Sequence, residues 1–492
     1  MEPTDTSPKL QLEGALDLSP APERCPVDIA DHYGHFINGA FVDGRDEDRF
    51  ATVNPATGEA IATIATASED EVDAAVRAAR TAHTDVWGPM PAAERGKYLY
   101  RIARRIQELS RELAVLETTD NGKPIRETRD VDVPLAAAHF FYYAGWADKL
   151  KYAAHGHAPR PLGVVGQVIP WNFPLLMAAW KIAPALATGN TVVLKPAETT
   201  PLTAMLLGRI LQEADLPPGV VNLVNGDGRT GAALMGHGDV DKVAFTGSTD
   251  VGRIILRQIA GSAKKATMEL GGKGAHLVFA DAALDQAVEG VIDGIFFNQG
   301  HVCCAGSRLL VEESIAPEFI ERVKRRVQTL RVGNPLDKNT DVGAINSAEQ
   351  LSTIRRYLEV GAAEGATVWQ GSACAPPDQG YFVQPTILTN VQQTDTVVRE
   401  EIFGPVLSVL TFRTPDEAVK KANDTEYGLA AGVWSEKTSK LFEVAHRLNA
   451  GVIWANGYNL FDPTSPFGGV RHSGFGREGG IAGLWPYMEV DA

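Results

Sequence analysis

The sequence predicts an α/β protein built on a parallel sheet with helices on both faces. From residue 164 onward, short runs of strand-forming residues alternate with helical segments. This alternation is typical of parallel strands, because each needs a crossover connection to reach its neighbour. A chain of 492 residues is too long for one hydrophobic core, so two or three domains are expected.

Composition narrows the classes of function. Hydrophobic residues make up 44% of the chain and charged residues 22%, as in ordinary globular proteins. The net charge of −15 argues against nucleic acid or an anionic membrane as partner. No apolar run is long enough to span a bilayer, and the N-terminus does not resemble a secretory signal. Four irregularly placed cysteines indicate a reducing, cytoplasmic compartment and not a disulfide framework.

The first residues, 1–32, are rich in proline and acidic residues and are expected to form a loosely held N-terminal arm. In an alternative interpretation, this arm docks on the body through Leu10, Leu12, Leu16 and Leu18.

Globular structure is expected to begin with a β-hairpin over residues 35–44, whose short strands flank an Asn-Gly pair. A helix over 68–82 begins at Ser68, with a glutamate three residues later at capping-box spacing. A longer helix is expected from Pro91 towards Leu116.

The sheet follows, and then a second α/β unit from Gly271 to about residue 460, with a glycine-rich tail over 465–480. Ligands bind parallel sheets at the carboxyl ends of the strands, where WNFP, KPAE and TGST fall. The expected strands are 164–169, 191–194, 220–224, 242–246 and 265–270. Four helices are expected between them: one that ends at Ala187, one over 200–214, a short one after Gly228, and one over 249–260.

Two adjacent cysteines, Cys303 and Cys304, lie in a segment of small residues downstream of Glu269. A sulfur nucleophile and a carboxylate base on either side of one segment suggest catalysis through a covalent bond to sulfur. Leucine and glycines beside Glu269 would keep water from its carboxylate, which raises the pKa towards neutrality and suits a base that activates water. Vicinal cysteines rarely bridge, because the disulfide strains the peptide between them.

Four motifs in order carry a family resemblance: FTGST (245–249), MELGGK (268–273), NQGHVCCAGSR (298–308) and EEIFGPV (400–406). Together they resemble the aldehyde dehydrogenase superfamily, and the resemblance covers residues 35–488. It implies an aldehyde dehydrogenase-like fold, with a Rossmann-type cofactor domain and an α/β catalytic domain. It also implies NAD-dependent oxidation of an aldehyde to its carboxylic acid.

The resemblance and the element pattern together suggest domain boundaries. These are an N-terminal arm (1–32), an NAD-binding domain (33–146 and 162–270), a catalytic domain (271–465) and a reduced oligomerisation element (147–161 and 481–492).

By resemblance, the nucleophile is the cysteine five residues after the Asn of NQG, which is Cys303, and Cys304 is a buried neighbour. The Asn172 side chain and the Cys303 backbone N–H would stabilise the oxyanion. Glu269 would activate the water that hydrolyses the thioacyl-enzyme, and its presence implies a free acid product, because CoA-acylating members lack it. Lys181 and Glu478 match family positions that relay protons from Glu269.

One position departs from the family, which usually has glutamine where this chain has His301. The imidazole either tunes Cys303 or packs near the pocket.

For the cofactor, the family uses the Lys and Glu of KPAE on the adenosine ribose, and an acid there favours NAD over NADP. The helix that starts after Ser248 offers free N–H groups to a pyrophosphate. No metal is implied. The expected cofactor residues are Trp171, Lys195, Glu198, Gly228, Thr246, Gly247, Ser248, Leu270, Glu401 and Phe403.

The family positions of the substrate pocket are apolar here, which favours an uncharged aliphatic or aromatic aldehyde. These residues are Phe173, Met177, Trp180, Val302 and Phe467.

Most relatives form a tetramer by strand exchange through a long β-hairpin after GWADK. Here only residues 150–160 separate GWADK from the strand at 164, and the chain ends at MEVDA, where relatives continue with a strand. We therefore expect a monomer, an atypical dimer or a hetero-complex. Two other functions stay open: a weakly active NAD-binding subunit of such a complex, and a thioester or ester hydrolase.

Overall fold

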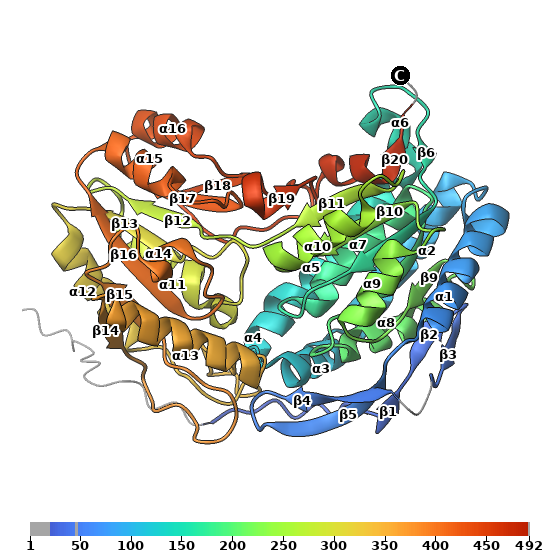
Figure 1. Ribbon diagram of the computed structural model, residues 1–492, viewed down its shortest axis with the longest axis horizontal. Helices are drawn as coiled ribbons and strands as arrows, with labels where there is room; N and C mark the ends of the chain where they lie inside the picture. Colours follow the sequence, from blue (N-terminus) through green and yellow to red (C-terminus); the bar gives the residue numbers. More distant parts are fainter. Residues whose placement is uncertain (1–19, 45–47, 491–492) are drawn as a thin grey trace, which may run out of the picture.

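The computed structural model describes residues 20–44 and 48–490, which form two lobes, each built on its own sheet (Figure 1). One lobe holds an eight-stranded sheet and the other a seven-stranded sheet. No helix in the described ranges is long and apolar enough to cross a membrane.

The eight-stranded sheet has five parallel strands at its centre, in the order β11-β10-β7-β8-β9. The chain passes from β7 to β8 and β9 on one side, then returns to place β10 and β11 on the other side. The carboxyl ends of β7 and β10 therefore flank a topological switch point, where ligands bind such sheets. All five expected strands are confirmed: β7 (Val164–Val168), β8 (Thr191–Lys195), β9 (Val221–Leu223), β10 (Lys242–Thr246) and β11 (Lys265–Glu269).

Antiparallel strands complete this sheet at its edges: β19 (Gly474–Phe475) beside β11, and the hairpin β2 (His35–Ile37) and β3 (Ala40–Val42) beside β9. The predicted Asn-Gly turn is confirmed, because Asn38 and Gly39 both have positive φ, 53° and 78°.

Both faces of the parallel strands are apolar, because successive side chains point to opposite helical layers. On one face Val164, Val193 and Val243 pack against α1 (Glu69–Ala82), α9 (Gly228–Gly236) and α10 (Thr249–Ile259). On the other, Val165 and Val192 join the cluster that includes α7 (Pro174–Ala187), α8 (Leu202–Glu213) and α5 (Val133–Trp146). The predicted capping box at Ser68 is present at the start of α1.

The single long helix expected from Pro91 is wrong, because the chain forms two helices there, α2 (Ala92–Glu108) and α3 (Ser110–Asn121). Leu109 between them is not helical, with φ −96° and ψ 14°. The break lets α2 pack against α5 and α7 while α3 packs against α8. Neither glycine nor proline marks it, so tertiary packing sets the helix end here.

The seven-stranded sheet has the order β14-β15-β16-β13-β12-β17-β18 and is parallel except for the β14–β15 pair. Helices α11 (Leu284–Phe296) and α12 (Ala316–Val327) cover one face, and α13 (Ala348–Ala363), α15 (Pro415–Asn423) and α16 (Thr438–Arg447) the other. Its strands are β12 (Ala275–Val278), β13 (Arg308–Glu312), β14 (Thr367–Gln370), β15 (Thr386–Thr389), β16 (Val406–Phe412), β17 (Ala430–Trp434) and β18 (Val452–Ala455).

A three-stranded sheet of β1 (His32–Tyr33), β5 (Glu59–Ala65) and β4 (Arg49–Asn54) lies along the lower edge of Figure 1. The segment that precedes it, residues 20–31, is bound to the body, so the expected loose attachment is wrong for this stretch. The Glu23 N–H donates to the Leu336 carbonyl at 2.7 Å, and the Glu23 carboxylate pairs with Arg111 at 2.5 Å. Leu10, Leu12, Leu16 and Leu18 lie outside the described residues.

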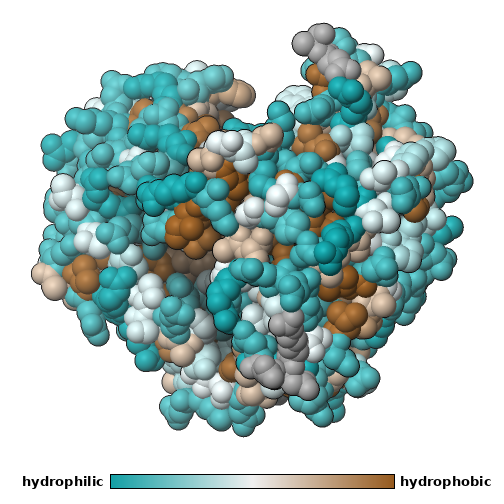
Figure 2. Space-filling view, turned by 45° about the vertical axis from the view of Figure 1, so that its right-hand side comes forward, coloured by the Kyte–Doolittle hydropathy of each residue, from teal (hydrophilic) through white to brown (hydrophobic). Residues whose placement is uncertain are grey.

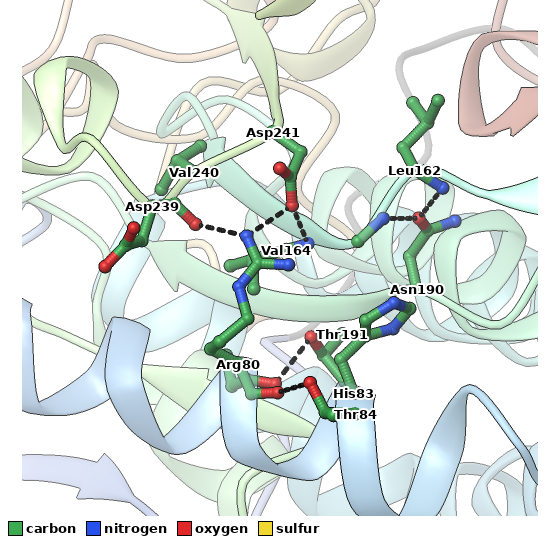
Figure 3. Close-up of polar contacts among 12 residues, drawn as sticks. Arg80, His83, Thr84, Leu162, Val164, Asn190, Thr191, Asp239, Val240 and Asp241 are labelled. Carbon is green, nitrogen blue, oxygen red and sulfur yellow. Dashed lines mark hydrogen bonds and ion pairs between the residues drawn. The ribbon is translucent and has the colours of Figure 1, made fainter.

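The short connection after α5 folds back on its own chain. It forms α6 (Leu150–Ala153), a turn, and β6 (Arg160–Pro161), which pairs antiparallel with β20 (Met488–Glu489). Asn190 ties this element to the sheet (Figure 3): its Oδ1 accepts from the Leu162 and Gly163 N–H groups at 2.8 and 2.9 Å. Its Nδ2 donates to the Tyr487 carbonyl at 2.9 Å. One buried amide therefore joins the start of β7 to the segment that leads into β20.

We expect Asn190→Ala to lower the free energy of unfolding by about 2–4 kcal/mol, because buried N–H and carbonyl groups lose their partners. Chemical denaturation followed by circular dichroism measures the change. Asn334→Ala is the control, since Asn334 is exposed and its side chain accepts one bond, from the Leu336 N–H. Equal effects of the two substitutions would contradict the role given to Asn190.

Candidate active site

A cavity of about 250 Å³ lies at the carboxyl ends of β7, β10 and β11, where the two lobes meet. In Figure 2, hydrophobic residues gather in a hollow between the lobes. Most of the site residues expected from the sequence line this cavity: Trp171, Asn172, Phe173, Met177, Trp180, Thr246, Gly247, Ser248, Glu269, Leu270, Val302, Cys303, Glu401, Phe403, Phe467 and Glu478.

The loop that carries the cysteines, residues 297–304, begins with a left-handed turn after α11. Asn298, Gln299 and Gly300 have φ values of 48°, 52° and 74°. We call residues 297–304 the cysteine loop. Hydrogen bonds hold it to the segment before α7: the Asn172 Nδ2 donates to the His301 carbonyl at 2.9 Å, and the Asn298 Nδ2 donates to the Asn172 carbonyl at 2.8 Å. Asn172 and Cys303 therefore face one cavity from different lobes.

The two cysteines differ in exposure. Cys303 is half-buried, whereas Cys304 is buried and its carbonyl accepts a hydrogen bond from the Tyr458 hydroxyl at 2.8 Å. The expectation that Cys304 is the buried neighbour is confirmed. A hydrogen bond with Cys304, together with burial, raises the pKa of the Cys303 thiol well above its ordinary value.

Glu269, at the end of β11, has both carboxylate oxygens buried, and neither accepts a hydrogen bond within the described part of the chain. Burial, and then repulsion from Glu478, raises its pKa well above the ordinary value. Gly468 lies against it with φ +157°, and a Cβ there would sit 2.7 Å from the Glu269 Oε1. A glycine is therefore required beside this carboxylate.

Glu478, next to Glu269, also lines the cavity. It forms a buried ion pair with Lys181, whose side chain does not line the cavity. Glu478 also exchanges backbone hydrogen bonds with Phe467, at 2.6 and 2.8 Å. Lys242 is buried nearby, and burial, followed by repulsion from Lys181, lowers its pKa to about 7.

On the far side of Cys303, the cavity continues to polar groups at the start of α10. Ser248 caps this helix, its Oγ accepting from the Val251 N–H at 3.3 Å, and the buried Thr246 hydroxyl has no partner among the described residues. The Glu401 carboxylate accepts from the Gly272 N–H at 2.9 Å, and burial raises its pKa to about 7. A Cβ on Gly271 would lie 2.2 Å from the Glu401 Oε2, so a glycine keeps this space open.

His301 packs within an aromatic cluster. Its ring centroid lies 4.8 Å from that of Trp171 and 5.9 Å from that of Phe403. Neither ring nitrogen has a hydrogen-bond partner among the described residues, and burial lowers the pKa to about 3. The imidazole is therefore neutral near pH 7.

Lys195, Glu198 and Gly228 lie outside the cavity. Lys195 ends β8, and its Nζ donates to the Pro196 carbonyl at 2.9 Å and lies 3.4 Å from the Glu198 Oε2. Gly228 begins α9. Burial lowers the pKa of Lys195. Lys195 lies at the carboxyl end of β8, and Glu198 and Gly228 follow the carboxyl ends of β8 and β9 in the same sheet.

The sequence missed several residues of the cavity wall. Leu176 and Phe297 lie beside recognised motifs, whereas Val131, Leu135 and Phe461 come from segments without any motif. The orientation of the Trp180 side chain is fixed by a contact outside the cavity, because its indole N–H donates to the buried His139 ring. Among the described residues, no group of three or more His, Cys, Asp or Glu side chains is arranged to hold a metal ion.

Comparisons with known proteins agree with this geometry. A sequence model described as "Aldehyde dehydrogenase family" matches residues 41–492. The mitochondrial aldehyde dehydrogenase of Homo sapiens is 46% identical, with 98% of this chain and 95% of that protein covered. An aldehyde dehydrogenase of Alternaria alternata is also 46% identical, covering 93% and 94% of the two chains.

Solved structures match as well. The NAD+ complex of an aldehyde dehydrogenase from Bacillus cereus superposes with a TM-score of 0.90 at 42% identity, covering 94% of this chain and 96% of that one. The fold, the order of the motifs and the convergence of their residues on one cavity have a single explanation: the chain belongs to the aldehyde dehydrogenase family.

Proposed function

We propose that this protein oxidises an aldehyde to its carboxylic acid, with NAD as the hydride acceptor and a covalent intermediate on Cys303. The observation that carries the proposal is the convergence of the Cys303 thiol, the Asn172 amide and the unpartnered Glu269 carboxylate on one cavity. Membership of the aldehyde dehydrogenase family supports it.

The residues present fit NAD, whose nicotinamide supplies the hydride acceptor when bound. The N-terminus of α10 at Ser248 offers free N–H groups to a pyrophosphate, and Thr246 adds an unpartnered hydroxyl. One carboxylate oxygen of Glu401 accepts the Gly272 N–H, and the other would accept a ribose hydroxyl, beside a glycine that leaves room. Lys195 and Glu198 would hold the second ribose, where the acid disfavours a 2′-phosphate.

The chemistry at Cys303 follows from its neighbours. The Cys303 thiol first loses its proton to water, and the sulfur then attacks the aldehyde carbon and gives the oxyanion of a thiohemiacetal. One N–H of the Asn172 amide donates to the His301 carbonyl. The other N–H can donate to the oxyanion, together with the Cys303 backbone N–H. Loss of hydride leaves an acyl thioester on Cys303. Glu269 then takes a proton from the water that releases the acid, and the Lys181–Glu478 pair carries that proton away.

The substrate is an uncharged aldehyde, because the side of the cavity around Cys303 is apolar. Phe173, Met177, Trp180, Val302 and Phe467 line it together with Leu176, Phe297 and Phe461. A buried charge on the substrate would find no partner on this wall, which costs free energy.

A weakly active NAD-binding subunit is the alternative function. The reduced element after α5 motivates it, whereas the complete set of Cys303, Asn172 and Glu269 in one cavity argues against it. Binding of NAD without NADH formation, for every aldehyde tested, would favour this alternative and overturn the proposal.

We expect Cys303→Ala to reduce NADH production from NAD and a medium-chain or aromatic aldehyde by on the order of 10³-fold or more, because the nucleophile is lost. Cys304→Ala is the matched control and should retain NADH production. Cys304 is buried, and loss of its hydrogen bond with Cys303 lowers the pKa of the Cys303 thiol, which favours the thiolate. Absorbance of NADH measures both. The reverse ranking of the two variants would assign the nucleophile to Cys304.

We expect Glu269→Gln to give a burst of about one NADH per active site and then a steady rate about 10²–10⁴-fold below wild type, because an amide cannot take the proton from water. Stopped-flow absorbance resolves the two phases. Glu349→Gln, at an exposed position in α13, is the control. A variant without a burst would place Glu269 before hydride transfer, and one with full turnover would remove it from the mechanism.

We also infer that the chain does not form a strand-exchanged tetramer, because β20 is already paired with β6 of the same chain. The Trp485 indole N–H donates to the Ala153 carbonyl at 3.0 Å and holds the two segments together. Light scattering of the purified protein is expected to give the mass of one or two chains. A mass of four chains, lost when β20 is deleted, would contradict this inference.

A further inference from the structure

A cluster of buried charged side chains lies beneath the cavity, and the proposed mechanism uses none of them. It consists of Glu117, Lys123, Glu127 and Asp132, which we call the acid cluster. Glu117 belongs to α3, and Glu127 ends the short helix α4 (Ile125–Glu127). Lys123 and Asp132 form an ion pair at 2.5 Å with both side chains fully buried. Burial of three carboxyl groups around one ammonium costs free energy of folding unless other contacts compensate for it.

Two of the carboxyl groups reach directly to the active-site segments. The Glu127 Oε2 accepts a hydrogen bond from the Asn298 backbone N–H at 2.9 Å, at the start of the left-handed turn of the cysteine loop. The Glu117 Oε2 accepts from the Leu175 N–H at 3.1 Å, in the first turn of α7 and three residues after Asn172. The Lys123 ammonium lies 3.9 Å from the centroid of the Phe173 ring, which lines the cavity.

The contact between Glu127 and Asn298 bears on the active site, because the Asn298 side chain binds two backbone carbonyls there. Its Nδ2 donates to the Asn172 carbonyl at 2.8 Å and to the His301 carbonyl at 3.3 Å. Asn298 and Gln299 both have positive φ. Asparagine tolerates this conformation, whereas glutamine adopts it only when the surrounding structure enforces it. Glu127 supplies such a bond from outside the loop.

We propose that Glu127 is a positioning residue for the oxidation reaction: by accepting the Asn298 N–H, it holds the left-handed turn that sets Cys303 against the Asn172 amide. This inference rests on the proposed function, since it concerns the placement of that nucleophile and that oxyanion donor.

The chemistry of the contact suggests which substitution should preserve it. Burial raises the pKa of Glu127 to about 8, so the carboxyl group is largely protonated at pH 7. A neutral carboxyl group still accepts through its carbonyl oxygen, and the side-chain amide of glutamine has the same shape and offers the same acceptor. Alanine removes the acceptor and leaves the Asn298 N–H buried without a partner.

The test compares Glu127→Gln with Glu127→Ala, using NADH production at pH 7. Glu127→Ala is expected to lower kcat by about 10- to 100-fold, because a small displacement of reacting groups has an effect of this size. The KM for NAD should change less than kcat, since Lys195, Ser248 and Glu401 are held by β8, α10 and the Gly272 N–H and not by the cysteine loop. Glu127→Gln should keep a kcat close to wild type. Glu127→Asp shortens the side chain by one methylene and moves the acceptor away from the Asn298 N–H, so its kcat should lie between those of the other two variants. It replaces Glu127→Ala in the test if the alanine variant does not fold.

Asp120→Asn and Asp120→Ala are the matched controls. Asp120 is a buried acid of α3, the helix that also carries Glu117. It accepts from the Leu202 N–H at 2.9 Å and from the Thr52 hydroxyl at 2.6 Å, away from the cavity. Loss of this acid should lower thermal stability without lowering the kcat of the folded protein. A purely structural role of Glu127 would give the same pattern.

A second readout separates this inference from the proposed function. The rate at which iodoacetamide alkylates Cys303, without NAD or aldehyde, is expected to differ from wild type in Glu127→Ala and to match it in Glu127→Gln. If the wild type makes no NADH with any aldehyde, the proposed function fails while this readout still tests the placement of Cys303. An unchanged kcat and alkylation rate in folded Glu127→Ala, or equal losses in the glutamine and alanine variants, would overturn the proposal.

Discussion

The active site depends on one joint between the lobes, the hydrogen bond from the Asn172 amide to the His301 carbonyl. Asn172 follows β7 of one sheet, and His301 lies in the cysteine loop, ahead of β13 of the other sheet. Neither lobe holds the whole candidate site, because Asn172 and Cys303 come from segments that belong to different sheets. A hydrogen bond fixes distance and direction together, which hydrophobic contact between the lobes does not do. The left-handed turn at 298–300, and Glu127, which accepts a hydrogen bond from it, support the contact between Asn172 and His301.

A second constraint is the burial of the carboxyl groups that line the cavity. Glu269 and Glu401 both have raised pKa values, and in both cases burial is the main cause. Burial increases the affinity of a carboxylate for a proton, which agrees with the role proposed for Glu269 as a base. The low polarity of a buried site also strengthens each hydrogen bond and makes each misplaced polar group costly. Glycines at 271 and 468 allow this close packing, because any side chain there would collide with a carboxylate.

Much of the fold follows from the sequence, because the alternation of strands and helices is local. The five central strands, the Asn-Gly hairpin and the capped start of α1 are visible in short segments. The break at Leu109 is not, since neither glycine nor proline marks it and packing alone decides it. The docking of residues 20–31 depends on contacts more than 300 residues away, such as that of Glu23 with Leu336. Glu127 escaped notice for the same reason, because its partner Asn298 is 171 residues distant.

The backbone pairing of Phe467 with Glu478 links two properties that are usually treated separately. Phe467 shapes the apolar wall, and Glu478 touches the buried charges behind Glu269. Because the two residues share both backbone hydrogen bonds of one bridge, a shift that widens the wall also moves the acid. A substitution at Phe467 that widens the wall is therefore also expected to shift the Glu478 carboxylate relative to Lys181.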